Sequence, residues 1–164
     1  MATTMDKLDK VIKKASKEAA YNCALRVTEE LTWRAKECVA EFYDEYDPKS
    51  YERWGQLENT PHAINPERVT AEANIEKYIG GVRISSDDMQ ELYNISAENV
   101  FNLAIKHGYH GLPGYMWTEY HESIKYKSTI EKMNEYFEDI KKKIPIYLKE
   151  EFDKSFSKYS SLLK

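Results

Sequence analysis

Three histidines are the side chains of this sequence that come nearest to a metal or catalytic site. His107 and His110 are three residues apart, and His121 follows further along the chain. A catalytic zinc site usually needs three protein ligands that converge on the ion. Gly108 follows His107 directly, and because glycine commonly ends a helix, we do not expect His107 and His110 to share one helix face. The sequence therefore predicts no metal site and a structural hydrogen-bonding role for His110.

Two pairs of adjacent carboxylates, Asp87-Asp88 and Glu150-Glu151, lack the arrangement that acid–base catalysis requires. Glycosidases place two carboxylates on opposite sides of a cleft, whereas adjacent residues of one element point in different directions. Asp87-Asp88 fits the N-terminal end of a helix, and Glu150-Glu151 fits a solvated surface. The sequence has no Gly-x-Ser-x-Gly nucleophile elbow, and Gly80-Gly81 is not part of a phosphate-binding loop. We therefore expect a protein that is not an enzyme and that holds no cofactor.

The composition favours one soluble globular domain with a hydrophobic core. The chain has 164 residues, of which 41% are hydrophobic and 32% charged, with a formal net charge of −4. This mild negative charge argues against a general phosphate-binding surface, which would be basic. No apolar run approaches the about 20 residues that cross a bilayer, and no apolar segment follows Met1, so we expect neither membrane insertion nor secretion.

Cys23 and Cys38 are the only cysteines. On one straight helix they would lie about 22 Å apart, whereas the Cα atoms of a disulfide lie within about 7 Å of each other. The sequence therefore predicts two free and buried thiols, which are typical of a reducing compartment.

A very long helix is predicted for Met5–Tyr46, which contains no glycine or proline. Such a helix would be about 63 Å long, whereas a compact domain of this size is about 40 Å across, so it either breaks or projects beyond its domain. Its apolar residues form two stripes, the first being Leu8, Ile12, Ala15 and Ala19 and the second Ala24, Val27, Leu31, Ala35, Cys38 and Phe42. The stripes are about 160° apart, so the two halves need different partners. We expect the second half to pack on the domain, and the first half to bend back or to meet another subunit.

A β-hairpin is predicted after this helix. Pro48 ends the helix, and residues 49–66 indicate an extended passage rich in loops. Val69–Ala73 and Ile75–Ile84 are the predicted strands. One face of the second strand consists of Tyr78, Gly80, Val82 and Ile84. Gly80-Gly81 indicates a bulge or a close approach of two backbones.

A short helix and a shaped loop follow the hairpin. Ser96 can cap a helix over Ala97–His107, with Gly108 immediately after its end. Residues 108–117 hold three of the six glycines. The large side chains of this loop, Tyr115, Met116 and Trp117, either lie at a protein interface or fold onto the sheet.

The C-terminal arm is also predicted to be helical. Ser128-Thr-Ile-Glu131 is a capping-box pattern, and Pro145 should kink or split the arm. Its apolar positions are Ile130, Met133, Phe137, Ile140, Ile144, Leu148, Phe152, Phe156, Tyr159 and Leu163. The pattern fits one bent arm or two stacked helices, whose apolar face covers either the chain's own sheet or a neighbour. The predicted fold is therefore α+β: one domain over 1–164, with a long helix over 1–46, a small antiparallel sheet, short helix and loops over 49–126, and a helical arm over 128–164.

Aromatic side chains make up 13% of the chain, and many lie outside the apolar stripes, such as Tyr43, Tyr46, Tyr51, Trp54 and Tyr115. Aromatic rings give large contact areas at low cost in side-chain entropy, which suits surfaces that bind proteins. The candidate interface residues are Leu8, Ile12, Tyr51, Arg53, Trp54, His110, Tyr115, Met116 and Trp117.

Three segments carry a resemblance to a known family. They are Phe42–Arg53 with Leu57–Asn59, then Gly81–Ser85 with Met89 and Tyr93, and then Glu98, Val100 and Phe101 closing into Gly108–Gly111. Over about residues 20 to 125, their order and spacing resemble the small neck, or tail-completion, proteins of tailed bacteriophages. This chain has Arg53-Trp54-Gly55 where Arg-Thr-Gly would be expected, and the arm after Ser128 lies outside the resemblance.

The resemblance implies an α+β fold and a non-enzymatic virion protein that completes the head–tail junction. It implies a ring of copies around the DNA channel, in contact with connector proteins and tail proteins, after assembly in the host bacterial cytoplasm. A head-side neck position and a tail-side terminator position both remain open. The alternative is a small enzyme or regulatory binding protein, encoded by a phage or mobile element, with a site near His107, His110 and Trp117.

Overall fold

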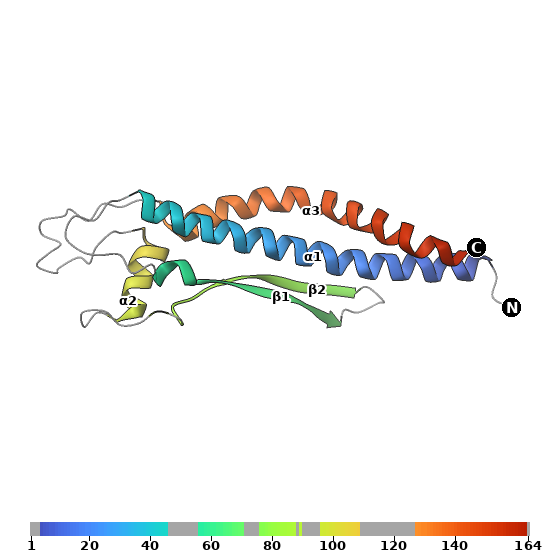
Figure 1. Cartoon of the computed structure of the whole chain (residues 1–164), viewed down its shortest axis with the longest axis horizontal. Helices are drawn as coiled ribbons and strands as arrows, with labels where there is room; N and C mark the ends of the chain where they lie inside the picture. Colours follow the sequence, from blue (N-terminus) through green and yellow to red (C-terminus); the bar gives the residue numbers. More distant parts are fainter. Residues whose placement is uncertain are drawn as a thin grey trace, which may run out of the picture. The chain divides into compact units, whose positions relative to one another are not determined.

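The computed structural model describes residues 4–45, 56–70, 76–87, 89, 96–108 and 127–163. In this part of the chain, the elements occur in the order α1 (Thr4–Asp44), η1 (Gln56–Asn59), β1 (Pro61–Thr70), β2 (Glu76–Ile84), α2 (Ala97–Phe101), η2 (Asn102–Lys106), α3 (Thr129–Ser160) and η3 (Ser161–Leu163) (Figure 1). Two long helices and a small two-stranded sheet give the α+β class that the sequence predicts. No helix in the described ranges is both long and apolar enough to span a membrane.

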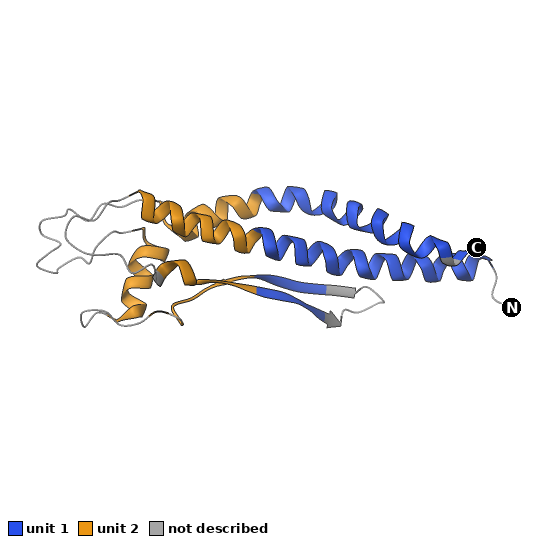
Figure 2. Ribbon diagram, in the orientation of Figure 1, with its two compact units in different colours: residues 1–30, 64–81, 139–164 blue, residues 31–63, 82–138 orange. Residues whose placement is uncertain are grey.

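The chain divides into two compact units (Figure 2). Unit 1 consists of Met1–Glu30, Ile64–Gly81 and Asp139–Lys164, and unit 2 of Leu31–Ala63 and Val82–Glu138. Each unit therefore contains part of α1, part of the hairpin and part of α3, and unit 2 also contains α2.

The long N-terminal helix is confirmed, and α1 is unbroken from Thr4 to Asp44. In unit 2 its buried residues include Leu31, Ala35, Cys38 and Phe42, as predicted. In unit 1 the buried apolar residues of α1 are Val11, Ala15, Ala19 and Cys23. Ile12, which the sequence places in the first stripe, is 41% exposed, whereas its neighbour Val11 is 3% exposed. The buried positions recur every four residues, so the stripe passes through Val11 and leaves Ile12 at its edge.

In unit 1, the first part of α1 packs against the last part of α3 of the same chain, and the two are antiparallel. Glu18 of α1 bonds Lys158 of α3, and Glu30 bonds Lys143, so residue numbers rise on one helix as they fall on the other. Ala15 and Ala19 are fully buried, and such small side chains allow two helices to approach closely. The first half of α1 thus has its partner within the chain and does not bend back.

The capping box at the start of α3 is confirmed in both directions. The backbone N–H of Glu131 donates to Ser128 Oγ at 3.1 Å, and that of Ser128 donates to Glu131 Oε2 at 2.7 Å. Pro145 lies inside α3, which continues through it as one helix, so the arm is not two stacked helices. Met133 and Ile140 form the buried part of its apolar face.

The predicted hairpin exists, but its first strand lies earlier than expected. β2 agrees with the prediction, whereas β1 covers Pro61–Thr70 instead of Val69–Ala73. Pro61 and Pro66 indicated a loop, yet both strands of a two-stranded sheet are edge strands, where proline is tolerated because one row of N–H groups has no strand to bond.

The hairpin approaches α1 closely at Gly80 in unit 1. A Cβ atom on Gly80 would lie 2.7 Å from Thr28 Oγ1 and 3.1 Å from the backbone oxygen of Ile64. Near this point the rings of Tyr21 and Tyr78 meet edge to face, with centroids 5.5 Å apart. The predicted close approach is therefore confirmed at Gly80, whereas a Cβ on Gly81 would meet no atom within 4 Å.

The hydrophobic core of unit 2 joins α1 to the short helices. Its buried members are Val39, Phe42, Leu57, Phe101, Ala104 and Ile105. Ser96 caps α2 through a 3.2 Å bond from the N–H of Asn99, and the helix continues as the π-helical turn η2. Gly108 follows with a φ of 71°, a left-handed conformation that suits glycine. The predicted cap and terminating glycine are both confirmed.

Candidate functional site

Two of the nine candidate interface residues lie in the described part of the chain. Leu8 is half-buried and Ile12 is 41% exposed, both on α1 in unit 1. The other seven, Tyr51, Arg53, Trp54, His110, Tyr115, Met116 and Trp117, lie outside the described residues. His107 is exposed after η2, while its two companions in the alternative site, His110 and Trp117, are among those seven.

Two features of the described residues bear on the binding of metals and small ligands. Among them, no group of three or more His, Cys, Asp or Glu side chains is arranged to hold a metal ion. In unit 2, a hollow of about 330 Å³ is lined by Lys36, Glu58, Asn59, Pro61 and His62. The charges of Lys36 and Glu58 offset each other there, so the hollow favours neither an anion nor a cation.

Both cysteines are free and buried, as predicted. Burial raises the pKa of Cys23 and of Cys38, because a thiolate loses solvation there. The Cys23 thiol donates to the backbone oxygen of Ile144 across the two helices, at 3.8 Å. A raised pKa keeps both side chains in the thiol form, which is neither a strong nucleophile nor a metal ligand.

Polar contacts join α1 to α3 throughout unit 1. The Nζ of Lys158 lies 2.7 and 3.0 Å from the two carboxylate oxygens of Glu18, and the Tyr159 hydroxyl also donates to Glu18. The hydrogen bonds from Lys158 and Tyr159 lower the pKa of Glu18. These contacts fix the register between the start of α1 and the end of α3.

Further along unit 1, Arg26 and Glu30 of α1 share one aromatic partner on α3. Arg26 bonds Glu150 at 2.6 Å, and its guanidinium lies 3.7 Å from the centroid of the Tyr147 ring. The Tyr147 hydroxyl donates to Glu30 at 2.7 Å, and Lys143 bonds the same carboxylate at 2.7 Å. The bond to Glu30 raises the pKa of Tyr147. Arginine stacks on an aromatic face more effectively than lysine, because its guanidinium is planar and weakly hydrated.

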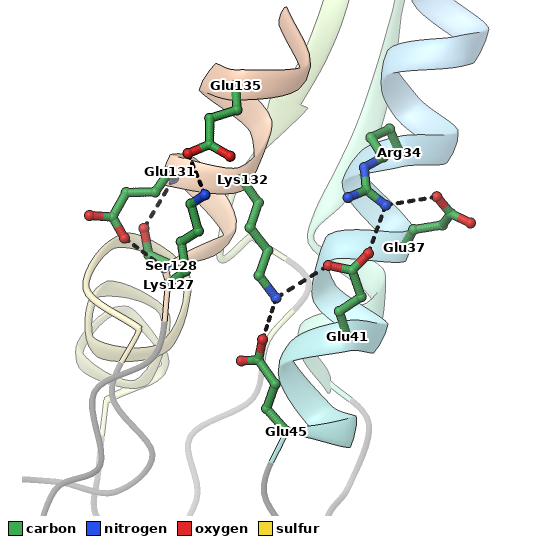
Figure 3. Close-up of polar contacts among 9 residues, drawn as sticks. All are labelled: Arg34, Glu37, Glu41, Glu45, Lys127, Ser128, Glu131, Lys132 and Glu135. Atoms are coloured by element: carbon green, nitrogen blue, oxygen red, sulfur yellow. Dashed lines mark hydrogen bonds and ion pairs between the residues drawn. The ribbon is translucent and has the colours of Figure 1, made fainter.

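In unit 2, Lys132 of α3 lies between two carboxylates of α1 (Figure 3). Its Nζ is 3.2 Å from Glu41 and 2.7 Å from Glu45, and its side chain is only 10% exposed. Burial acts to lower the pKa of Lys132, but hydrogen bonds to Glu45 and Glu41 outweigh it and raise this pKa. Glu41 also accepts from Arg34 at 2.7 Å. Burial acts to raise the pKa of Glu41, and the bonds from Arg34 and Lys132 lower it overall.

These contacts stabilise the helix pair and leave the carboxylates occupied by basic or hydroxyl partners. Exposed ion pairs contribute little individually, about 0 to 1 kcal/mol each, whereas the half-buried Lys132 cluster contributes more per pair because water screens it less. The polar residues named above therefore join the two helices.

Several large apolar side chains are exposed on the same two helices. On α3 in unit 1, Ile144 is 37%, Ile146 57% and Leu148 43% exposed, and on α1 in unit 2, Trp33 is 58% exposed. The sequence analysis did not identify Trp33, because it considered only the apolar residues that form the stripes of α1 and not the residues beside them. The available signal was a tryptophan spaced at helical intervals from Glu37, Ala40 and Asp44, on a face that has no other large apolar residue.

Comparison with known proteins adds one relationship. No curated protein and no solved structure matches the chain. The family model described as YomN matches residues 4–152, which include α1, the hairpin, α2 and most of α3. The match covers most of the chain and includes both the N-terminal helix and the first part of the C-terminal arm, up to residue 152. The chain therefore belongs to the YomN family, a family of proteins derived from Bacillus phages.

Proposed function

We propose that this protein is a non-enzymatic virion protein that completes the head–tail junction of a tailed bacteriophage, as a ring of copies around the DNA channel. The observation that carries the proposal is membership of a phage-derived family over residues 4–152. The resemblance of the sequence segments around Phe42–Arg53 and Gly81–Ser85 to neck and tail-completion proteins supports this role among those of phage proteins.

The described structure supports this role through its helix pair. Polar contacts between α1 and α3 recur in both units, for example at Glu18 with Lys158 and at Glu45 with Lys132. Such contacts hold two long helices in one register and leave apolar side chains such as Trp33 and Ile146 exposed to solvent. A stiff pair with exposed apolar side chains suits a subunit that binds neighbouring proteins through its faces.

Quantitative mass spectrometry of gradient-purified phage particles tests the proposal. The amount of this chain is measured against the portal protein in the same particles, with an abundant host protein measured as a control for purity. The expected result is a low copy number in a simple ratio to the portal. A chain that is absent from intact particles, or present only at the level of the host control, would overturn the proposed function.

A further inference from the structure

The two units of this chain carry opposite net charges. Unit 1 contains 15 Lys and Arg against 12 Asp and Glu, which gives a formal charge of +3. Unit 2 contains 9 Lys and Arg against 16 Asp and Glu, which gives −7. The overall charge of −4 is therefore the sum of a positive unit 1 and a more strongly negative unit 2. Polarity of this kind favours contacts between unlike units of two copies and disfavours contacts between like units.

The middle of α3 gives unit 1 a surface that is both apolar and basic. Ile144, Ile146 and Leu148 are 37%, 57% and 43% exposed. The stretch 139–149 that contains them has four lysines and a single acid, Asp139, which bonds Lys142 at 2.9 Å. We define the α3 patch as the exposed side chains Lys141, Ile144, Leu148 and Lys149, which lie on one side of the helix. Ile146 is about 200° from Ile144 around the helix and is not part of this patch.

The second half of α1 gives unit 2 a surface that is both apolar and acidic. Trp33, Glu37, Ala40 and Asp44 follow one another at intervals of three or four residues and so share one helix face. Trp33 is 58% exposed, Ala40 and Asp44 are exposed, and the Glu37 side chain is 38% exposed. These four residues are the α1 patch. Their face carries two carboxylates, of which Glu37 also bonds Arg34 at 3.0 Å, beside a tryptophan, a residue type that often anchors protein interfaces.

We propose that copies of this chain associate head to tail, with the α3 patch of one copy bound to the α1 patch of the next. The apolar side chains Ile144 and Leu148 would cover Trp33, and Lys141 and Lys149 would face Glu37 and Asp44. This inference rests on the proposed function, because a closed ring requires a heterologous interface of two different surfaces. It deepens that function by assigning both surfaces, each of which carries its own apolar residues and a complementary charge.

Sedimentation velocity of the full chain over a range of concentrations tests the interface. One variant carries Lys141→Glu and Lys149→Glu, and a second carries Glu37→Lys and Asp44→Lys. A matched control, Lys7→Glu with Lys10→Glu, makes the same change of charge at exposed positions of unit 1 outside the α3 patch. Circular dichroism verifies that every variant is folded, and Trp33→Ser and Leu148→Ser test the apolar part without changing charge.

The expected result is a reversible self-association of the wild-type chain that weakens as salt is added. Each patch variant alone should associate about tenfold or more weakly, while the control variant associates like the wild type. Mixing the two patch variants should restore association, because each reversed patch then meets a reversed partner. A chain that stays monomeric, patch variants that associate like the wild type, or a mixture that is not restored would each overturn the inference.

This experiment can fail independently of the proposed function. If the chain is present in phage particles in a simple ratio to the portal but the patch variants associate normally, the assigned surfaces are wrong while the virion role stands. If the chain associates through these patches but is absent from particles, the interface stands and the head–tail role is overturned.

Discussion

Thr28 on α1 and Gly80 on β2 lie so close that a methyl group on Gly80 would be 2.7 Å from the Thr28 hydroxyl oxygen. A Cβ at this position would also lie 3.1 Å from the Pro66 Cα, which is backbone and cannot rotate away. We predict that Gly80→Ala destabilises the protein by about 1 to 3 kcal/mol, since strand and helix must separate to admit the methyl group.

Gly81→Ala is the matched control, because a Cβ there meets no atom within 4 Å. It should leave the free energy of unfolding unchanged or raise it by about 0.4 to 1 kcal/mol, since alanine restricts the unfolded chain. Urea unfolding followed by circular dichroism measures both variants. Equal effects at the two positions would show that the close contact does not constrain the fold.

A second prediction distinguishes the inner edge of α1 from its outer edge in unit 1. Val11 is 3% exposed and Ile12 is 41% exposed, although they are adjacent. Val11→Asp should destabilise the fold by several kcal/mol, about 3 or more, because an unpaired carboxylate would be buried between the helices. Ile12→Asp should change the free energy of unfolding by less than about 1 kcal/mol, since its carboxylate reaches water.

Thermal melting of the two variants provides the measurement. The test is which variant has the lower melting temperature, and not the exact value of either. Ile12→Asp can then be used as a folded variant to test whether Ile12 contacts a neighbouring protein in assembly. If Ile12→Asp melted as early as Val11→Asp, Ile12 would belong to the core, and its place among the interface candidates would be lost.

The third prediction concerns pH. The pKa of Glu41 is lowered from 4.5 by Arg34 and Lys132, after burial has acted in the opposite direction. A lowered folded-state pKa adds stability that is present above about pH 4.5 and is lost as the pH falls through the folded-state value. The pKa of Lys132 is raised from 10.5, so its contribution is complete below about pH 10.5 and is lost only above it. The free energy of unfolding should therefore decrease in acid and stay constant around neutral pH.

Melting temperatures of the wild type and of Glu41→Gln between about pH 7 and pH 3 verify this dependence. The variant should melt earlier than the wild type at pH 7, and the difference should shrink as the pH falls, because the wild-type carboxylate is then protonated as well. A difference that stays constant down to pH 3 would assign the effect of the substitution to packing and not to ionisation.

The sequence was most informative where one short pattern determines local structure. The capping box at Ser128, the cap at Ser96 and the glycine after His107 depend on neighbouring residues only, and the structure reproduces all three. The strand from Pro61 was missed because proline propensity disfavours strands in general, and only the tertiary fact that both strands are edges permits it.

The candidate site was less predictable than the fold. Periodicity located the apolar stripes of both helices, but which part of each stripe is covered depends on the distance and rotation of the partner helix. Ile144 and Leu148 continue the same apolar pattern as Ile140, yet Ile140 is fully buried and the other two are about two-fifths exposed. Trp33 was overlooked for the related reason that exposure cannot be read from residue type.

The last prediction concerns the cap that begins α3. Ser128 is fully buried, and its hydroxyl accepts from the Glu131 N–H at 3.1 Å, so Ser128→Ala leaves that donor without its partner and should cost about 1 kcal/mol of stability. Ser157→Ala, at an exposed position of the same helix, should be neutral or slightly stabilising because alanine has the higher helix propensity. Chemical unfolding of both variants gives the comparison.

Hydrogen exchange of the first turn of α3 adds a local measurement, and faster exchange in Ser128→Ala alone is the expected result. If Ser128→Ala matched Ser157→Ala in both measurements, the first turn of α3 would be held by the packing around Met133 and Lys132 and not by its cap.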